Sequence, residues 1–228
     1  MNKNERFDSI TGRFPPGSFM FYLQRYELFY MRIAKCASES ISNWIKFNID
    51  DIVSIRSNPV HTWENSFTCI RNPFDRLVSS YKHFIFRKQI PPIMQMEGLS
   101  YITFSEYVDR IITVGHPEEL TDSEGVKRRF LYQNVNPTLD DWKYILRFHT
   151  VPMTHPFHDA SKFTDILRFE NLKNDWKNVL GKYGIPYLPL GHDNKVEGEP
   201  YCTYYDEDTR NIVAEYFKED LLTFDYKF

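Results

Sequence analysis

One cation, two hydroxyls and small side chains occupy six consecutive positions: Lys35, Cys36, Ala37, Ser38, Glu39 and Ser40. The apolar run Leu28–Ala34 before them predicts a buried strand, and the spacing of apolar residues in Ser38–Phe47 predicts a helix. A strand that passes through a turn into a helix exposes unpaired N–H groups and the positive end of the helix dipole. These residues therefore predict a cradle for a phosphate or sulfate group, with Lys35, Ser38 and Ser40 as donors. The alternative is an ordinary strand-to-helix turn with an exposed Lys.

A second stretch with polar residues at a strand end begins at Arg71 and reads R-N-P-F-D-R-L-V-S-S-Y. It follows a predicted buried strand, Ser66–Ile70, and ligands of open α/β sheets bind at the carboxyl ends of strands. An Arg fork and the hydroxyl of Ser79 suit a second phosphate. A surface ion pair for Arg71 and a solvent-facing Ser79 is the alternative.

The same stretch predicts a helix, because Asn72 suits the N-cap and Pro73 the first helical position. Its apolar stripe includes Leu77 and Val78. Helical geometry then places Ser79 on the side away from the core, together with Asp75 and Arg76.

Length and composition favour one α/β domain over residues 1–228, with residues 1–27 as an N-terminal arm. The net charge of −3 gives no field that favours nucleic acid. Three distant Cys residues without a C-x-x-C pattern predict neither a disulfide framework nor a metal site. No apolar run is long enough to span a membrane, so we expect a cytoplasmic protein. A luminal domain lacking its membrane anchor is the alternative.

The rest of the chain alternates strand and helix patterns. These are predicted strands at Ile52–Ile55 and Phe163–Phe169, a helix at Phe104–Val114, a helix after Asn171 that ends at Gly184, and a last helix that begins at Asp206.

Together the two motifs resemble the sulfotransferase family. The likeness is to its carbohydrate and membrane-associated branch, which includes heparan 2-O-sulfotransferases and short bacterial and viral members. It implies an α/β fold of three layers, with a small central parallel sheet flanked by helices, similar to P-loop nucleotide kinases. The donor implied is 3′-phosphoadenosine 5′-phosphosulfate (PAPS), with PAP as product. In the family the first motif holds the 5′-phosphosulfate end, and an Arg and a Ser eight residues apart, here Arg71 and Ser79, hold the 3′-phosphate.

Two positions of the first motif depart from the family pattern. Ala34 stands where Pro is usual, and Glu39 stands where a small or hydroxyl residue is usual. A carboxylate at Glu39 would repel a phosphosulfate if it pointed inward, whereas pointing outward it would complement the helix dipole.

Sulfuryl transfer needs a cation that neutralises charge on the leaving phosphate and a base for the attacking hydroxyl. Lys35 suits the first task. The resemblance implies that His61, in the loop before the strand that ends at Arg71, takes the proton, and an imidazole titrates near neutrality. Glu64 is the alternative base, and a loop His that caps a turn is the alternative for His61.

The sequence therefore predicts a PAPS-dependent transfer of a sulfuryl group to an acceptor hydroxyl, with a glycan as the expected acceptor and no metal. One alternative is a non-catalytic nucleotide- or glycan-binding protein of the same fold. Another is an ATP-dependent kinase, which would need the G-x-x-x-x-G-K-[ST] loop that this chain lacks.

Overall fold

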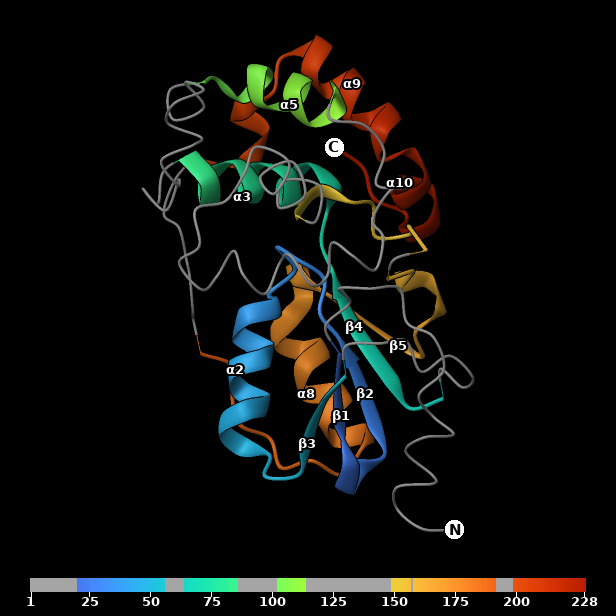
Figure 1. The fold of residues 1–228 in the computed structure, drawn as a ribbon. Helices are drawn as coiled ribbons and strands as arrows, with labels where there is room; N and C mark the ends of the chain where they lie inside the picture. The colour runs from blue at the N-terminus through green and yellow to red at the C-terminus, as the bar shows by residue number, and fades with distance from the viewer. Residues whose placement is uncertain (1–19, 56–63, 86–101, 114–148, 157, 192–198) are drawn as a thin grey trace. The chain divides into compact units, whose positions relative to one another are not determined.

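A five-stranded sheet forms within the residues that the computed structural model describes, 20–55, 64–85, 102–113, 149–156, 158–191 and 199–228 (Figure 1). The strand order is β3-β1-β2-β4-β5. The strands are β1 (Met20–Leu23), β2 (Leu28–Met31), β3 (Ile52–Ile55), β4 (Ser66–Ile70) and β5 (Asp165–Arg168).

Three neighbouring strands, β2, β4 and β5, run parallel, as predicted. All residues of β2 and β4 are buried, as expected for strands covered on both faces. β1 pairs antiparallel with both β2 and β3, so the sheet is mixed. The α/β class with a central sheet and flanking helices is confirmed.

The strand β1 lies within residues 1–27, the stretch predicted to be an N-terminal arm. The hairpin that joins β1 to β2 turns at Glu27, whose φ of 48° is left-handed. Gly or Asn is the usual sign of such a turn, and neither is present, so the hairpin left no local signal.

Two helices, α2 (Ser38–Asn48) and α8 (Leu172–Lys182), lie side by side against one face of the sheet (Figure 1). Trp44 of α2 meets Trp176 of α8 edge to face, with ring centroids 4.9 Å apart. Trp176 also contacts Phe67 of β4 at 6.1 Å. These rings make the core between the helices and the sheet.

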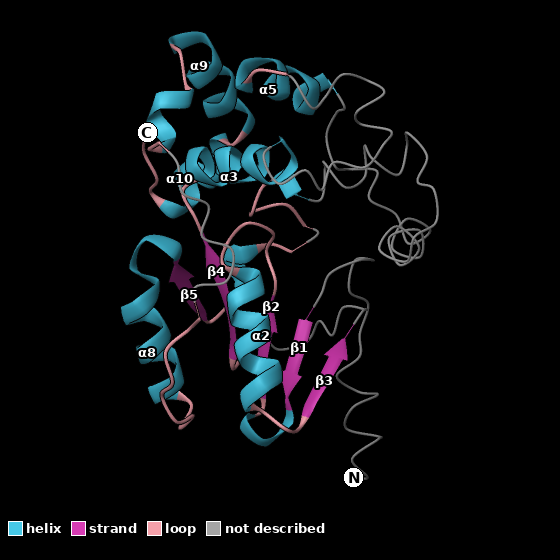
Figure 2. Cartoon of the chain, turned by 90° about the vertical axis from the view of Figure 1, so that its left-hand side faces the viewer, coloured by secondary structure: helices cyan, strands magenta, loops and turns pink. Residues whose placement is uncertain are grey.

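The chain divides into two compact units. The first contains the sheet, α2 and α8, and the second contains most of the remaining helices (Figure 2). Those helices are α3 (Pro73–Ile85), α5 (Phe104–Thr113), α9 (Glu207–Tyr216) and α10 (Lys218–Phe224), with the short helix η6 (Tyr201–Tyr204). Their core is aromatic and aliphatic, and includes Phe74, Tyr81, Tyr107 and Phe217. Among the described helices, none is long and apolar enough to cross a membrane.

The C-terminal residues pack against the start of α3 within the second unit. The Asn72 amide donates to the Lys227 carbonyl at 2.7 Å, and the Phe228 ring packs edge to face on Phe74, with centroids 5.0 Å apart. Tyr205 also contacts the Phe228 ring, at 5.4 Å, and its hydroxyl donates to the Phe74 carbonyl. The C-terminal residues therefore hold the turn that carries the second motif.

We expect Phe228→Ala to lower the free energy of unfolding by roughly 1–2 kcal/mol, because the ring is only partly buried yet meets several aromatic partners. Leu222→Ala is the matched control: Leu222 is 76% exposed against 45% for Phe228, and surface truncations stay within about 0.5 kcal/mol. Chemical denaturation followed by circular dichroism measures both. Equal losses in the two variants would contradict the docking of Phe228.

Candidate functional site

The first motif forms the turn between β2 and α2, as predicted, and its backbone is unusual. Lys35 and Ala37 both have left-handed conformations, with φ of 68° and 55°. Such a conformation costs a residue with a Cβ roughly 1–2 kcal/mol. Strained backbone of this kind is concentrated at functional sites.

The first turn of α2 lacks a side-chain cap. Its N-cap residue, Ala37, has no side-chain oxygen, and the first helical hydrogen bond runs from the Ile41 N–H to the Ala37 carbonyl. The N–H groups in the first turn of an α-helix have no preceding carbonyl of that helix to donate to, and in α2 they point toward its N-terminus. Together with the partly exposed Lys35 and the helix dipole, they make a turn suited to an anion.

Cys36 has a different place in this turn from its neighbours. Its side chain is fully buried, and its thiol lies 4.0 Å from the Met153 sulfur. Its N–H donates to the Ile33 carbonyl at 3.2 Å. Cys36 thus closes the turn and anchors it to the core.

Glu39 forms an ion pair with Arg32, the residue that directly follows β2. The Glu39 side chain is 57% exposed, whereas that of Arg32 is only 19% exposed. The sequence does not single out Arg32, because this residue lies within the predicted apolar strand Leu28–Ala34. A charge between Met31 and Ile33 was the available signal, since charged residues rarely enter buried strands without a partner.

Tyr30 is a second residue that the sequence did not single out. Its side chain is fully buried, and its hydroxyl has no hydrogen-bond partner among the residues that the structure describes. Burial raises the pKa of the Tyr30 phenol well above its ordinary value, while the nearby Arg32 guanidinium lowers it. The ring stacks on Phe67 at 4.7 Å and so joins the sheet core to the residues around the first motif.

The second motif starts α3 as predicted. The Asn72 side-chain oxygen accepts the Phe74 N–H at 3.0 Å, which confirms the N-cap. Arg71 pairs through Nε with Asp75 at 2.8 Å, and the side chains are 13% and 25% exposed. Because this bond fixes the Nε edge of the guanidinium, Asp75 sets the orientation of the Arg71 fork. Ser79 is half-buried on the same helix.

The prediction that Arg76 faces away from the core is wrong. Its side chain is 1% exposed, and Nη1 donates to the Val151 carbonyl at 2.7 Å within the second unit. A backbone carbonyl from a distant segment gives a buried guanidinium its partner, and the helical pattern alone cannot reveal such a partner.

Of the two candidate bases, the structure describes only Glu64. His61 lies outside the described residues, whereas Glu64 is exposed just before β4. Lys35–Ser40 belong to the first unit, and Arg71 and Ser79 to the second.

In the described part of the chain, no three His, Cys, Asp or Glu side chains gather as metal ligands.

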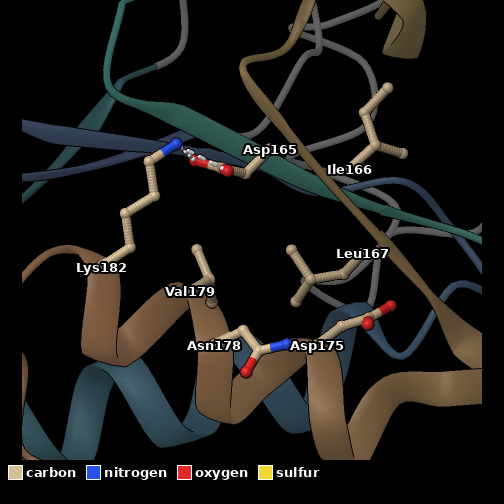
Figure 3. Close-up of a pocket in the computed structure, with 7 residues that line it drawn as sticks. All are labelled: Asp165, Ile166, Leu167, Asp175, Asn178, Val179 and Lys182. Atoms are coloured by element: carbon tan, nitrogen blue, oxygen red, sulfur yellow. Dashed lines mark hydrogen bonds and ion pairs between the residues drawn. The ribbon is translucent and has the colours of Figure 1, made fainter.

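A separate small pocket lies between β5 and α8 (Figure 3). Asp165 pairs with Lys182 at 2.7 Å and accepts a hydrogen bond from the Tyr183 hydroxyl, while Asp175 accepts the Arg168 N–H. Burial and the Asp165 carboxylate raise the pKa of Tyr183. Since two carboxylates line it, this pocket does not suit a phosphate.

A model of the sulfotransferase family matches residues 19–227, a range that contains both motifs. No curated protein and no solved structure matches the chain.

The left-handed conformation of Ala37 can be tested by replacing Ala with Gly at two positions, Ala37 and Ala214. Ala214→Gly, inside α9, is expected to lower the free energy of unfolding by about 1 kcal/mol, since Gly disfavours helix interiors. Ala37→Gly should leave it unchanged or raise it by up to about 0.5 kcal/mol, because Gly relieves the left-handed strain. Urea unfolding of both variants measures the difference. A loss at Ala37 equal to that at Ala214 would exclude the strained turn.

Proposed function

This chain belongs to the sulfotransferase family, and we propose that it transfers the sulfuryl group of PAPS to the hydroxyl of a carbohydrate. The observation that carries the proposal is the parallel pairing of the two strands that precede the motifs. One follows β2 and the other follows β4, and these strands are parallel neighbours whose carboxyl ends lie at the same edge of the sheet. Ligands of open α/β sheets bind at that edge.

In the proposed reaction, the acceptor oxygen forms a bond to sulfur while the bond between sulfur and the 5′-phosphate oxygen breaks. The products are a sulfate ester and PAP. Charge accumulates on the leaving phosphate, where Lys35, Ser38, Ser40 and the first-turn N–H groups of α2 would stabilise it. The acceptor proton passes to His61, and Arg71 and Ser79 hold the 3′-phosphate. No metal takes part.

The geometry of the second motif supports a phosphate ligand. The Arg71 side chain is largely buried and held by Asp75, and a held guanidinium loses little rotamer freedom when it binds phosphate. Ser79 lies two turns along the same helix. The choice of a carbohydrate as acceptor is based on the family resemblance alone.

The cysteines favour a reducing compartment such as the cytoplasm. Cys36, Cys69 and Cys202 form no disulfide with one another, and the first two are buried. Free thiols are typical of proteins that fold where disulfides do not persist.

The 3′-phosphate contact is tested by comparing two nucleotides. Adenosine 3′,5′-bisphosphate should bind more tightly than adenosine 5′-monophosphate. ATP should bind more weakly than the bisphosphate. Arg71→Ala should weaken binding of the bisphosphate about 10- to 100-fold, the size of a charge-assisted hydrogen bond, and leave the monophosphate unchanged. Isothermal titration calorimetry measures this. Arg25→Ala, at an exposed arginine of the β1–β2 hairpin, is the control.

Tighter binding of ATP than of the bisphosphate would favour a kinase and contradict the proposal. Equal weakening of both adenosine phosphates by Arg71→Ala would remove Arg71 from the 3′-phosphate.

The catalytic roles are tested by sulfate transfer from PAPS to a panel of glycans. Lys35→Ala should lower kcat about 10²- to 10³-fold, as loss of an oxyanion-stabilising group does. His61→Ala should lower it about 10²- to 10⁴-fold, as loss of a general base does, while Glu64→Gln changes it little. A fast His61→Ala enzyme combined with a slow Glu64→Gln enzyme would move the base to Glu64. Bisphosphate binding without transfer to any acceptor would favour a non-catalytic binding protein.

A further inference from the structure

The Arg32–Glu39 ion pair spans the first motif from one end to the other. Arg32 directly follows the last residue of β2, and Glu39 is the second residue of α2. The strained turn with Lys35 and Ala37 lies between them. The pair therefore connects the strand and the helix on both sides of the proposed anion site.

An unpaired carboxylate at Glu39 would oppose the proposed function. Glu39 lies between Ser38 and Ser40, in the turn whose N–H groups would face a phosphosulfate. A negative charge at this position stabilises the empty helix through the dipole, but it repels a second anion that binds at the same terminus. The chain needs a way to keep this charge from the ligand.

We propose that Arg32 is a positioning residue of the anion site, which neutralises Glu39 and holds its carboxylate away from the bound 5′-phosphosulfate. The inference rests on the proposed function and deepens it. Arg32 touches neither the nucleotide nor the acceptor, and it acts through Glu39.

The burial of the two partners supports this assignment. Arg32 is the less exposed partner, so its guanidinium has a fixed place at the end of β2, whereas the more exposed Glu39 is drawn toward it. Both charges act on the buried Tyr30 phenol, whose pKa Arg32 lowers and Glu39 raises. The carboxylate is thus held toward the strand side of the turn.

The number of charged side chains around the turn also supports the role of Arg32. From Arg32 to Ser40 the chain carries two cations, Arg32 and Lys35, and one anion, Glu39. When Arg32 and Glu39 neutralise each other, the positive charge of Lys35 and the helix dipole remain for the ligand. Without Arg32, Glu39 would cancel Lys35.

The test measures binding of two probes, inorganic pyrophosphate and adenosine 3′,5′-bisphosphate, by isothermal titration calorimetry. Arg32→Gln should weaken both about tenfold, within the range for one charge at a helix terminus. Glu39→Gln should leave binding unchanged or strengthen it about threefold. The double variant Arg32→Gln/Glu39→Gln should return to within about twofold of the parent, because the charge that Arg32 neutralises is gone.

Lys182→Gln is the matched control, because it removes a cation from another ion pair of the same unit, with Asp165 (Figure 3). It should leave binding of both probes unchanged. Adenosine 3′-monophosphate provides a second control: it lacks the 5′ charge, so Arg32→Gln should not alter its affinity.

Three results with the variants would overturn the inference. They are unchanged pyrophosphate binding in Arg32→Gln, a double variant as weak as Arg32→Gln alone, and weaker binding in Glu39→Gln. Weaker binding in Glu39→Gln requires no substitution at Arg32, so this result tests the inference even if Arg32→Gln does not fold. Pyrophosphate binding with the expected pattern, but without preference for the bisphosphate, would overturn the PAPS assignment and leave the role of Arg32 intact. A parent that binds neither probe would overturn both.

Discussion

Parallel pairing of β2 with β4 is the constraint on which the first unit depends. The register joins Phe29 to Ser66 and Met31 to Thr68, and the Thr68 hydroxyl donates to the Met31 carbonyl at 3.0 Å. This side-chain bond fastens the two strands at the point where β2 ends. Since parallel strands share a direction, the turns that follow them leave the sheet at one edge. A slip of one residue between the strands would put Tyr30 and Phe67 on opposite faces of the sheet.

The helix starts differ in how their N–H groups are satisfied. Asn72 caps α3 and Asp206 caps α9, each through a side-chain oxygen. Ala37 offers no such oxygen to α2. The chain thus combines an uncapped helix with two left-handed residues at the same turn. This combination costs stability, and backbone strain of this kind is concentrated at functional sites.

Local patterns predicted much of this fold. The strands Ile52–Ile55 and Ser66–Ile70, and the caps at Asn72 and Asp206, agree with the sequence because turn residues and apolar runs fix them locally. The strand β1, the burial of Arg76 and the pairing of Arg32 with Glu39 were not foreseen. Each depends on a partner that becomes adjacent only in the folded chain: a hairpin without a turn signal, the Val151 carbonyl, and a carboxylate across a strained loop.

The pairing of β4 with β5 has a consequence for how the chain folds. Ser66 accepts the Thr164 N–H from 98 residues further along, and the second unit's described residues 71–85, 102–113 and 149–152 lie in that interval. The chain passes from the first unit to the second, returns for β5 and α8, and then completes the second. No single cleavage separates the two, and a fragment ending before β5 has an unpaired strand edge. Closing so long a loop has an entropic cost, so we infer that the sheet begins at the β1–β2 hairpin and adds β5 late.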